Sequence, residues 1–238
     1  MEENTTKKKS KKIYIVLGII VLVCALLFLL VEKMRINQVE RDLDSYEAEM
    51  ASAFPIPEYN KINDSFKSAI HNVFKSNGYF ESGEYFLTKI PDRAKKVIAY
   101  GNFSNDPDAN EDSDIAFILE KNDFKSSSIF LMSETGLLLF QKEYVEELPT
   151  ISSFKKGDKI FMDDLVLVPA PSDGVLVYFK YRKVVLLYNP KTKSFEEYHQ
   201  YTNEDLKSMK EEESYHPEDY EEESEAATSD TTAASLEN

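Results

Sequence analysis

The feature that most constrains this chain is an apolar run at residues 13–31, IYIVLGIIVLVCALLFLLV, which is 19 residues long and contains no charged side chain. At about 1.5 Å per residue, a helix of this length extends roughly 28 Å, close to the bilayer's hydrocarbon thickness of about 30 Å. The run therefore predicts one membrane-spanning helix, and it divides the chain into a short N-terminal segment and a long C-terminal one.

A cleaved secretory signal is the alternative to a permanent anchor. Signal peptides have an apolar segment of about 7–15 residues, followed closely by a cleavage site of small residues. The A-x-A match in this chain, residues 51–53, lies twenty residues past the apolar run. Cys24 does not suit a lipoprotein signal, because Val23 precedes it and the apolar run continues beyond it. We therefore expect an uncleaved anchor.

The charges that flank the run predict its orientation. Residues 1–12 carry five Lys and two Glu, whereas the other flank is mixed, with Glu32, Lys33 and Arg35. Positively charged flanks stay in the cytoplasm, so the N-terminus is expected inside and residues after 32 outside. Lys outnumbers Arg by 24 to 4, which is typical of AT-rich bacterial genomes. The expected location is the bacterial cytoplasmic (inner) membrane, with most of the chain periplasmic or extracellular.

Residues 32–54 are predicted to form a juxtamembrane helix. Its apolar residues alternate spacings of three and four: Ile36, Val39, Leu43, Tyr46, Met50 and Ala53. This seam fits either a stalk helix that packs on its own domain or a weak parallel homodimer through residues 36–53. Fewer than three heptads are present, and Asp42 and Glu47 would repel each other across a dimer, so the stalk is favoured.

Residues 55–83 predict an amphipathic helix and a linker. Pro57 suits a first helical position, and Gly78 suits the residue just past a helix end. Between them, over residues 58–76, one face is apolar: Ile62, Phe66, Ala69, Ile70, Val73 and Phe74. His71 lies beside this face and is interpreted as a packed or surface histidine rather than a ligand.

Residues 84–202 switch to the pattern of short strands. Ten segments rich in β-branched and aromatic residues are separated by turns: YFLTKI, VIAYGNF, DIAFILE, SIFLMS, GLLLFQKEY, KIFMD, LVLVP, GVLVYFK, VVLLYN and SFEEYH. Gly136 indicates a hairpin. Residues 189–192 indicate a turn with proline at its second position, and Pro169 indicates a loop or a sheet edge. The prediction is an α+β protein whose mostly antiparallel β domain is a blade-like sheet or a sandwich.

Residues 203–238 are predicted to form a disordered acidic tail. They hold two Lys against 13 acidic residues, which accounts for −11 of the chain's net charge of −15. Such a segment buries too little apolar surface to offset the entropy of ordering. A recognition tail for a basic partner and calcium buffering are alternatives to plain solvation. Basic residues cluster only at the extreme N-terminus, which argues against a nucleic-acid partner.

The most conspicuous polar stretch is DPDANEDSD, residues 106–114, directly before an apolar strand. Oxygen-bearing side chains recur at every second position: Asp106, Asp108, Asn110, Asp112 and Asp114. A helix–loop–helix calcium site needs glycine at its sixth position and glutamate at its twelfth, where this chain has Glu111 and Phe117. Two interpretations remain: a looser Ca²⁺ site, or a solvated turn whose side chains cap their own backbone.

The region around this stretch resembles one unit of the FG-GAP/VCBS-type repeat, over about residues 97–140. The matching positions, in order, are Gly101, Asn102, Phe103, Ser104, Asp106 and the pair Asp114-Ile115. Asn102 replaces the family's first Asp, the loop glycines are missing, and about four residues are inserted before Asp114. The resemblance implies Ca²⁺ bound by the five alternating residues. It occurs once, so a complete propeller of at least four blades does not fit.

Catalytic motifs are absent from the sequence. No GxGxxG, GxxxxGK, HExxH or GxSxG occurs, and the histidines are His71, His199 and His216. Carboxylate pairs such as Asp163-Asp164 are neighbours in sequence, and neighbours on a strand point to opposite faces. We therefore expect a non-enzymatic binding or scaffold protein of the envelope, with the membrane and another envelope protein as partners and no cofactor unless Ca²⁺ binds. The alternatives are a calcium-stabilised FG-GAP-like recognition module and an envelope hydrolase.

Overall fold

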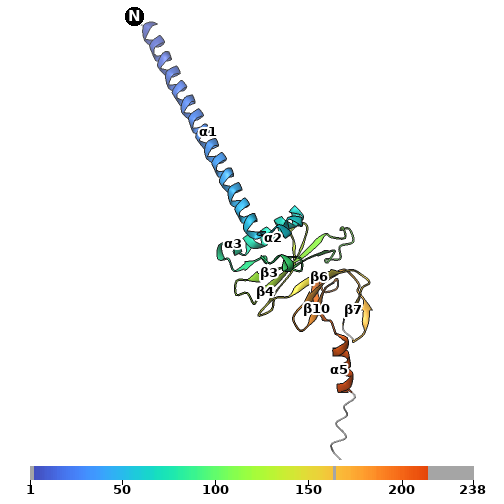
Figure 1. The fold of residues 1–238 in the computed structure, drawn as a ribbon. Helices are drawn as coiled ribbons and strands as arrows, with labels where there is room; N and C mark the ends of the chain where they lie inside the picture. The colour runs from blue at the N-terminus through green and yellow to red at the C-terminus, as the bar shows by residue number, and fades with distance from the viewer. Residues whose placement is uncertain (1–2, 163–164, 214–238) are drawn as a thin grey trace, which may run out of the picture.

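The computed structural model describes residues 3–162 and 165–213, with side chains described for residues 22–162 and 165–209. The chain is an α+β protein in which one long helix leads into a domain of mostly antiparallel strands (Figure 1), and the predicted fold class is confirmed at this level. The helix, α1 (Glu3–Ala53), is 51 residues long and projects from the domain. It runs without a break through residue 32, where the sequence suggested a boundary between two helices.

Within the part of the chain that the structure describes, none of the helices combines the length and the apolar character that crossing a membrane requires.

The C-terminal end of α1 packs on the domain, while the rest of its described length does not. Ala53 is fully buried, the Tyr46 ring lies 5.0 Å from the ring of His71, and Glu49 Oε2 lies 2.7 Å from His71 Nε2. Farther from the domain, Ile36 and Leu43 are more than half exposed. The predicted apolar seam of residues 36–53 is thus divided. Its C-terminal part, from Tyr46, packs on its own domain, so a homodimer could use only the N-terminal part that includes Ile36 and Leu43.

Short helices connect α1 to the sheets. They are the 3₁₀ helix η1 (Pro57–Lys61), α2 (Asp64–Ser76), α3 (Tyr79–Ser82) and, farther along, α4 (Pro91–Ala94). Pro57 begins a helix as predicted, but that helix is the short η1. The single helix predicted over residues 58–76 was wrong, because α2 begins only at Asp64. Asn63 caps α2 by accepting a hydrogen bond from the Ser65 N–H at 3.0 Å. Tyr59 is instead buried in η1, where its hydroxyl donates to the Thr88 carbonyl at 2.8 Å.

All strand pairs within the described residues are antiparallel, and they form two main sheets and a separate hairpin. The first sheet has the order β1-β3-β4-β5, with β2 also paired to β3, the second has the order β11-β10-β9-β6, and β7 pairs with β8. The strands are β1 (Tyr85–Phe86), β2 (Ile98–Gly101), β3 (Asp114–Lys121), β4 (Ser127–Ser133), β5 (Leu138–Tyr144), β6 (Thr150–Phe154), β7 (Lys159–Phe161), β8 (Leu167–Pro169), β9 (Gly174–Tyr178), β10 (Lys183–Asn189) and β11 (Ser194–His199). Each of the ten predicted segments contains a strand, and β6 is one that was not predicted.

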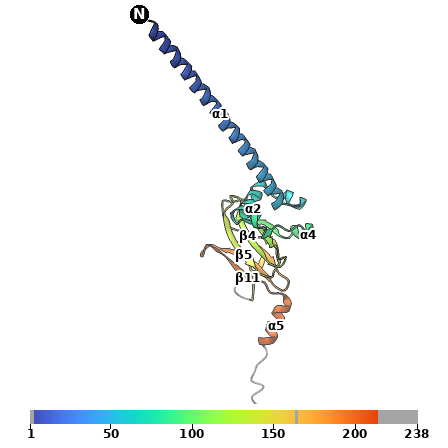
Figure 2. The same cartoon turned by 90° about the vertical axis from the view of Figure 1, so that its left-hand side faces the viewer.

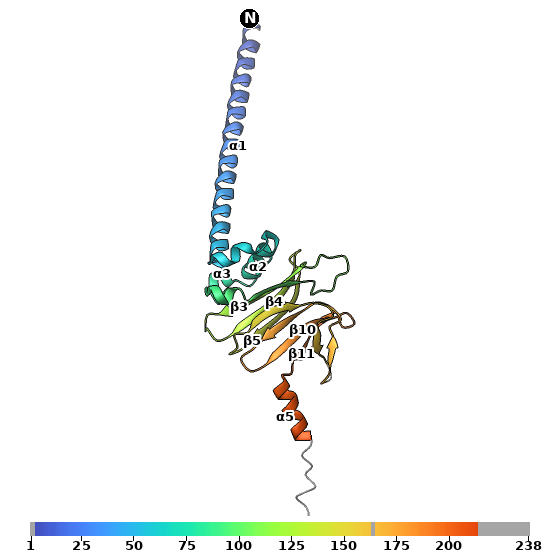
Figure 3. The same cartoon turned by 45° about the vertical axis from the view of Figure 1, so that its right-hand side comes forward.

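The two sheets pack face to face, and helices cover the outer face of the first (Figure 3). Side chains of β3 alternate: Phe117 joins the cluster under α2, while Ala116 and Ile118 join the cluster between the sheets. The outer face of β10 packs through Val185 against the β7–β8 hairpin. Because β3 is buried on both faces, its sequence is a continuous apolar run rather than an alternating one.

The chain leaves the second sheet through α5 (Asn203–Glu213), which extends away from the domain on the side opposite α1 (Figures 1 and 2). Thr202 and Asp205 cap each other: the Asp205 N–H donates to Thr202 Oγ1 at 3.1 Å, and the Thr202 N–H donates to Asp205 Oδ2 at 2.7 Å. The predicted disordered tail started at residue 203, whereas residues 203–213 form this helix. The remainder of that tail, 214–238, lies outside the described residues.

Candidate functional site

The structure places the predicted calcium ligands in the connection between β2 and β3. Asp106, Asp108, Asn110 and Asp112 lie exposed along this loop. Asp114 differs, because it is the first residue of β3 and is only 1% exposed. The alternating residues of the sequence are therefore split between solvent and the interior.

Side chains of this loop bond mainly to the loop's own backbone. The Asp108 N–H donates to Asp106 Oδ1 at 3.0 Å, and the Asp106 N–H donates to Asn102 Oδ1 at 2.9 Å. The Ser104 N–H donates to the buried Asp114 Oδ2 at 2.7 Å. Such contacts are typical of a capped turn. Burial raises the pKa of Asp114, although its hydrogen bonds act in the opposite direction.

Among the residues that the structure describes, no group of three or more Asp, Glu, His or Cys side chains is arranged to hold a metal ion. The Ca²⁺ site at Asp106, Asp108, Asn110, Asp112 and Asp114 stays a prediction. Gly101 is the first position of the family resemblance, and packing explains why a glycine stands there. A Cβ at this position would lie 2.6 Å from the ring of the buried Phe103.

The histidines lie on different elements. His71 is buried in α2 against Glu49 of α1, which confirms the interpretation of a packed histidine. His199 ends β11, with its ring 4.6 Å from that of Tyr201. His216 lies outside the described residues.

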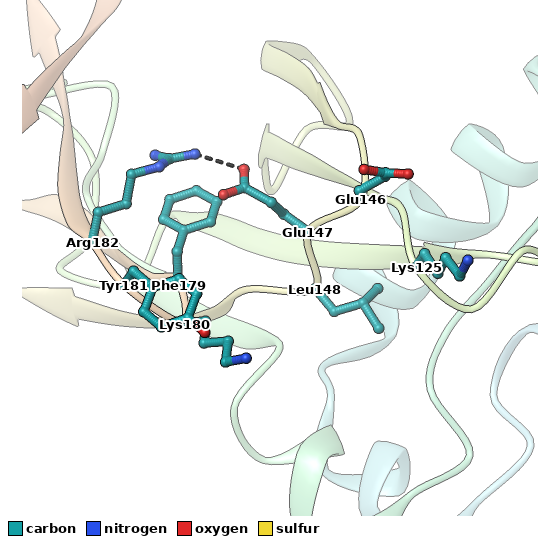
Figure 4. A pocket seen from close by; sticks show the side chains of 8 residues that line it. All are labelled: Lys125, Glu146, Glu147, Leu148, Phe179, Lys180, Tyr181 and Arg182. Carbon is teal, nitrogen blue, oxygen red and sulfur yellow. Dashed lines mark hydrogen bonds and ion pairs between the residues drawn. The ribbon is translucent and has the colours of Figure 1, made fainter.

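A larger surface feature is a groove of about 800 Å³ formed by three loops (Figure 4). Lys125 comes from the β3–β4 turn, residues 146–148 follow β5, and residues 179–182 form the β9–β10 turn. The strands bring these loops to one end of the two sheets: Ser127 pairs with Tyr144, and Tyr178 pairs with Lys183. We name this feature the terminal groove.

The terminal groove has a packed floor. The Arg182 guanidinium lies 3.6 Å from the centre of the Phe179 ring and pairs with Glu147 at 2.6 Å, as Figure 4 shows. Phe179 in turn contacts Tyr144, with ring centres 5.0 Å apart. The Tyr144 hydroxyl donates to Glu197 Oε1 at 3.1 Å, and burial raises the pKa of this tyrosine, so that it remains a donor. These contacts hold the two sheets together beneath the groove.

The rim of the terminal groove is apolar and aromatic but exposed. Tyr181 is 87% exposed and Leu148 is 37% exposed, and Val145, next to the groove, is 69% exposed. Within the described residues, Lys125 and Lys180 form no ion pair, whereas Arg182 is paired with Glu147. Exposed apolar and aromatic side chains that lie together are typical of surfaces that bind other polypeptides.

The terminal groove was not predicted from the sequence. Its residues are scattered over residues 125–182 and belong to turns, which carry no periodic signal. One local signal was present: KYRK, residues 180–183, places basic and aromatic side chains together between two apolar strands. Its meaning depends on the loops that the fold places opposite it.

Comparisons with known proteins do not extend this description. No protein-family model, curated protein or solved structure matches the chain. The FG-GAP/VCBS-type resemblance of residues 97–140 thus stays a prediction from the sequence, and the function is argued from the residues themselves.

Proposed function

We propose that this protein is a single-pass, membrane-anchored binding module of a bacterial envelope. Residues 13–31 hold it in the bilayer, the N-terminus faces the cytoplasm, and the β domain presents the terminal groove to another envelope protein. The observation that carries the anchor is the exposure of α1: the large apolar side chains of residues 22–31 are 47–64% exposed and surround the helix. Helices that are apolar on all sides are stable when lipid or protein covers them.

The geometry of the domain supports binding rather than chemistry. The acidic loop of residues 106–114 bonds to its own backbone, whereas the terminal groove combines the exposed Tyr181 ring with two lysines that form no ion pair in the described part of the chain. A rigid floor under an exposed rim lets a partner bind without ordering the groove first, which limits the entropy lost on binding.

Membrane extraction tests the anchor. The intact chain should stay with membranes after an alkaline carbonate wash and dissolve in detergent. Leu22→Lys/Val23→Lys places two charges at the centre of the apolar run, where each costs about 2.5–3.5 kcal/mol, and should release the chain. Val39→Lys is the matched control, because Val39 is equally exposed on the same helix but lies outside the run. Release of the unaltered chain by carbonate would overturn the proposal.

Cysteine labelling tests the orientation. In a Cys24→Ser chain, Lys61→Cys puts a single thiol at an exposed position of η1. A maleimide that does not cross membranes should label this thiol in intact cells. Labelling only after lysis would place the β domain in the cytoplasm and contradict the proposed topology.

A further inference from the structure

The charge of the terminal groove and the length of the chain beyond α5 point to an occupant within the same molecule. We propose that the groove binds the chain's own acidic segment, residues 219–225 (DYEEESE), so that the protein covers its binding surface when no partner is present. This inference rests on the terminal groove being a binding surface, as the proposed function does, but it does not depend on the membrane anchor.

The path of the described chain leaves the tail within reach of the groove. The Gln200 N–H donates to the Lys183 carbonyl at 2.9 Å, and Lys183 follows Arg182 of the groove directly. Helix α5 starts at Asn203, three residues after the residue that bonds to Lys183. Its 11 residues lead away over about 16 Å, and about five residues of extended chain cover the same distance back. The first segment that reaches the groove thus begins near residue 219.

The chemistry of the segment complements that of the groove. Residues 219–225 contain five carboxylates and Tyr220, and residues 214–238 contain no Lys or Arg. The groove is lined by three basic side chains, Lys125, Lys180 and Arg182, and by two acidic ones, Glu146 and Glu147. Arg182 already neutralises Glu147, and Lys125 and Lys180 form no ion pair with a described carboxylate, so the groove keeps one net positive charge even with Glu146 counted. Tyr181, with its ring 4.7 Å from Lys180 Nζ, provides an exposed face for an aromatic side chain such as Tyr220.

Tethering makes this contact effective even if it is weak. Ion pairs at an exposed groove contribute little each, typically below about 1 kcal/mol. Because residues 219–225 belong to the same chain as the groove and follow α5 by only a few residues, however, their effective concentration at the groove is on the order of millimolar. The tail would then outcompete acidic segments of other molecules until a tighter partner displaces it.

A peptide-binding measurement tests self-occupation. The probe is a fluorescent peptide of residues 214–226, and the proteins are the full chain in detergent and the same chain ending at residue 213. We expect the shortened chain to bind the peptide at least about ten-fold more tightly, because the full chain's own tail competes for the groove. Equal affinity for the two chains would overturn the proposal.

Charge reversal locates the binding surface. In the shortened chain, Lys125→Glu/Lys180→Glu should weaken peptide binding at least about ten-fold, since two attractions become repulsions. Lys159→Glu/Lys191→Glu is the matched control, because both lysines are exposed and lie outside the groove. Unchanged melting temperatures would show that both variants are folded. Equal weakening in both variants would indicate attraction to overall charge and would contradict a defined groove.

Cross-linking distinguishes the chain's own tail from a second copy. A carbodiimide, which joins amines to carboxylates, should link Lys125 or Lys180 to residues 219–225 within one molecule. In a mixture of isotopically labelled and unlabelled full chains, cross-linked peptides should carry a single label. Mixed labels would replace self-occupation with exchange between copies. If these tests fail while the chain keeps its membrane retention and topology, self-occupation is lost and the anchored module remains.

Discussion

The acidic loop of residues 106–114 and the terminal groove each contain five charged side chains, but they use them differently. In the loop, Asp106 and Asp114 accept hydrogen bonds from backbone N–H groups of the same loop. In the groove, Arg182 pairs with Glu147, while Lys125 and Lys180 have no carboxylate within ion-pair distance among the described residues. Polar groups close in sequence can satisfy the backbone beside them. In the groove, side chains from separate turns meet in one pair, Arg182 with Glu147, and Lys125 and Lys180 lie beyond ion-pair distance of the described carboxylates.

The largest expected effect separates the buried and exposed members of the loop. Asp114→Ala leaves the Ser104 N–H without its acceptor and should lower the free energy of unfolding by about 1–3 kcal/mol. Asp108→Ala removes an exposed side chain and should change the free energy of unfolding by no more than about 0.5 kcal/mol. Chemical denaturation of both variants measures the difference. Equal losses would mean that the exposed carboxylates are also structural.

The pH dependence of Asp114 sharpens the same distinction. Because burial raises its pKa in the folded state, the folded chain holds this proton more tightly than the unfolded chain does. The stability contributed by Asp114 is therefore present below the unfolded pKa and lost as pH rises through the folded pKa. Asp114→Asn should destabilise the chain more at pH 3.5 than at pH 7. A loss that grows with pH would contradict this sign.

In the groove, one substitution should lower the stability of the fold, and another should weaken peptide binding without changing stability. Arg182→Ala removes the ion pair with Glu147 and the stacking on Phe179, and should cost about 1 kcal/mol of stability. Tyr181→Ala should leave the melting temperature nearly unchanged, since the side chain is 87% exposed, yet weaken binding of the acidic peptide. Unchanged peptide binding in Tyr181→Ala would show that the rim does not contact the ligand.

The smallest effect is expected from calcium. A site with a Kd near 10 μM would add about 2.7 kcal/mol in 1 mM Ca²⁺ and raise the melting temperature by roughly 5 °C or more. Because the loop side chains cap their own backbone, we expect a difference below about 1 °C between Ca²⁺ and EDTA. A larger shift that disappears in Asp108→Ala/Asp112→Ala would restore the calcium-site interpretation and erase the contrast with the groove.

Strand prediction succeeded where the core is apolar and failed at β6. Its sequence, TISSF, has two large apolar residues, Ile151 and Phe154, among polar ones. Ser152 pairs with Leu176 of β9, and the Ile151 N–H donates to the Lys96 carbonyl at 2.7 Å. The strand therefore exists because partners on both sides take its backbone hydrogen bonds, which is information that a five-residue window does not contain.

The helix ends show the reverse situation, in which a local signal was present but not used. Asn63 before α2 and the Thr202–Asp205 pair before α5 are both capping patterns readable in the sequence. Pro57 suggested an earlier start for α2, and the acidity of residues 203–213 suggested disorder. In each case the prediction followed a conspicuous feature, a proline or a run of acidic residues. The short polar cap that determines where the helix begins was overlooked.

The sequence by itself determined the features that depend on neighbouring residues: the apolar run of residues 13–31, the ten apolar strand segments and the turns between them. Periodicity and turn chemistry act over a few residues, so they can be recognised without the fold. Only the tertiary structure decided that α1 meets α2 at Glu49 and His71, that Asp114 is buried while Asp108 is not, and that Lys125 lies across from Lys180. These outcomes depend on strand order and sheet packing, which bring together residues far apart in the chain. Whether a side chain is buried, or a charge lacks a partner, is decided by those long-range contacts.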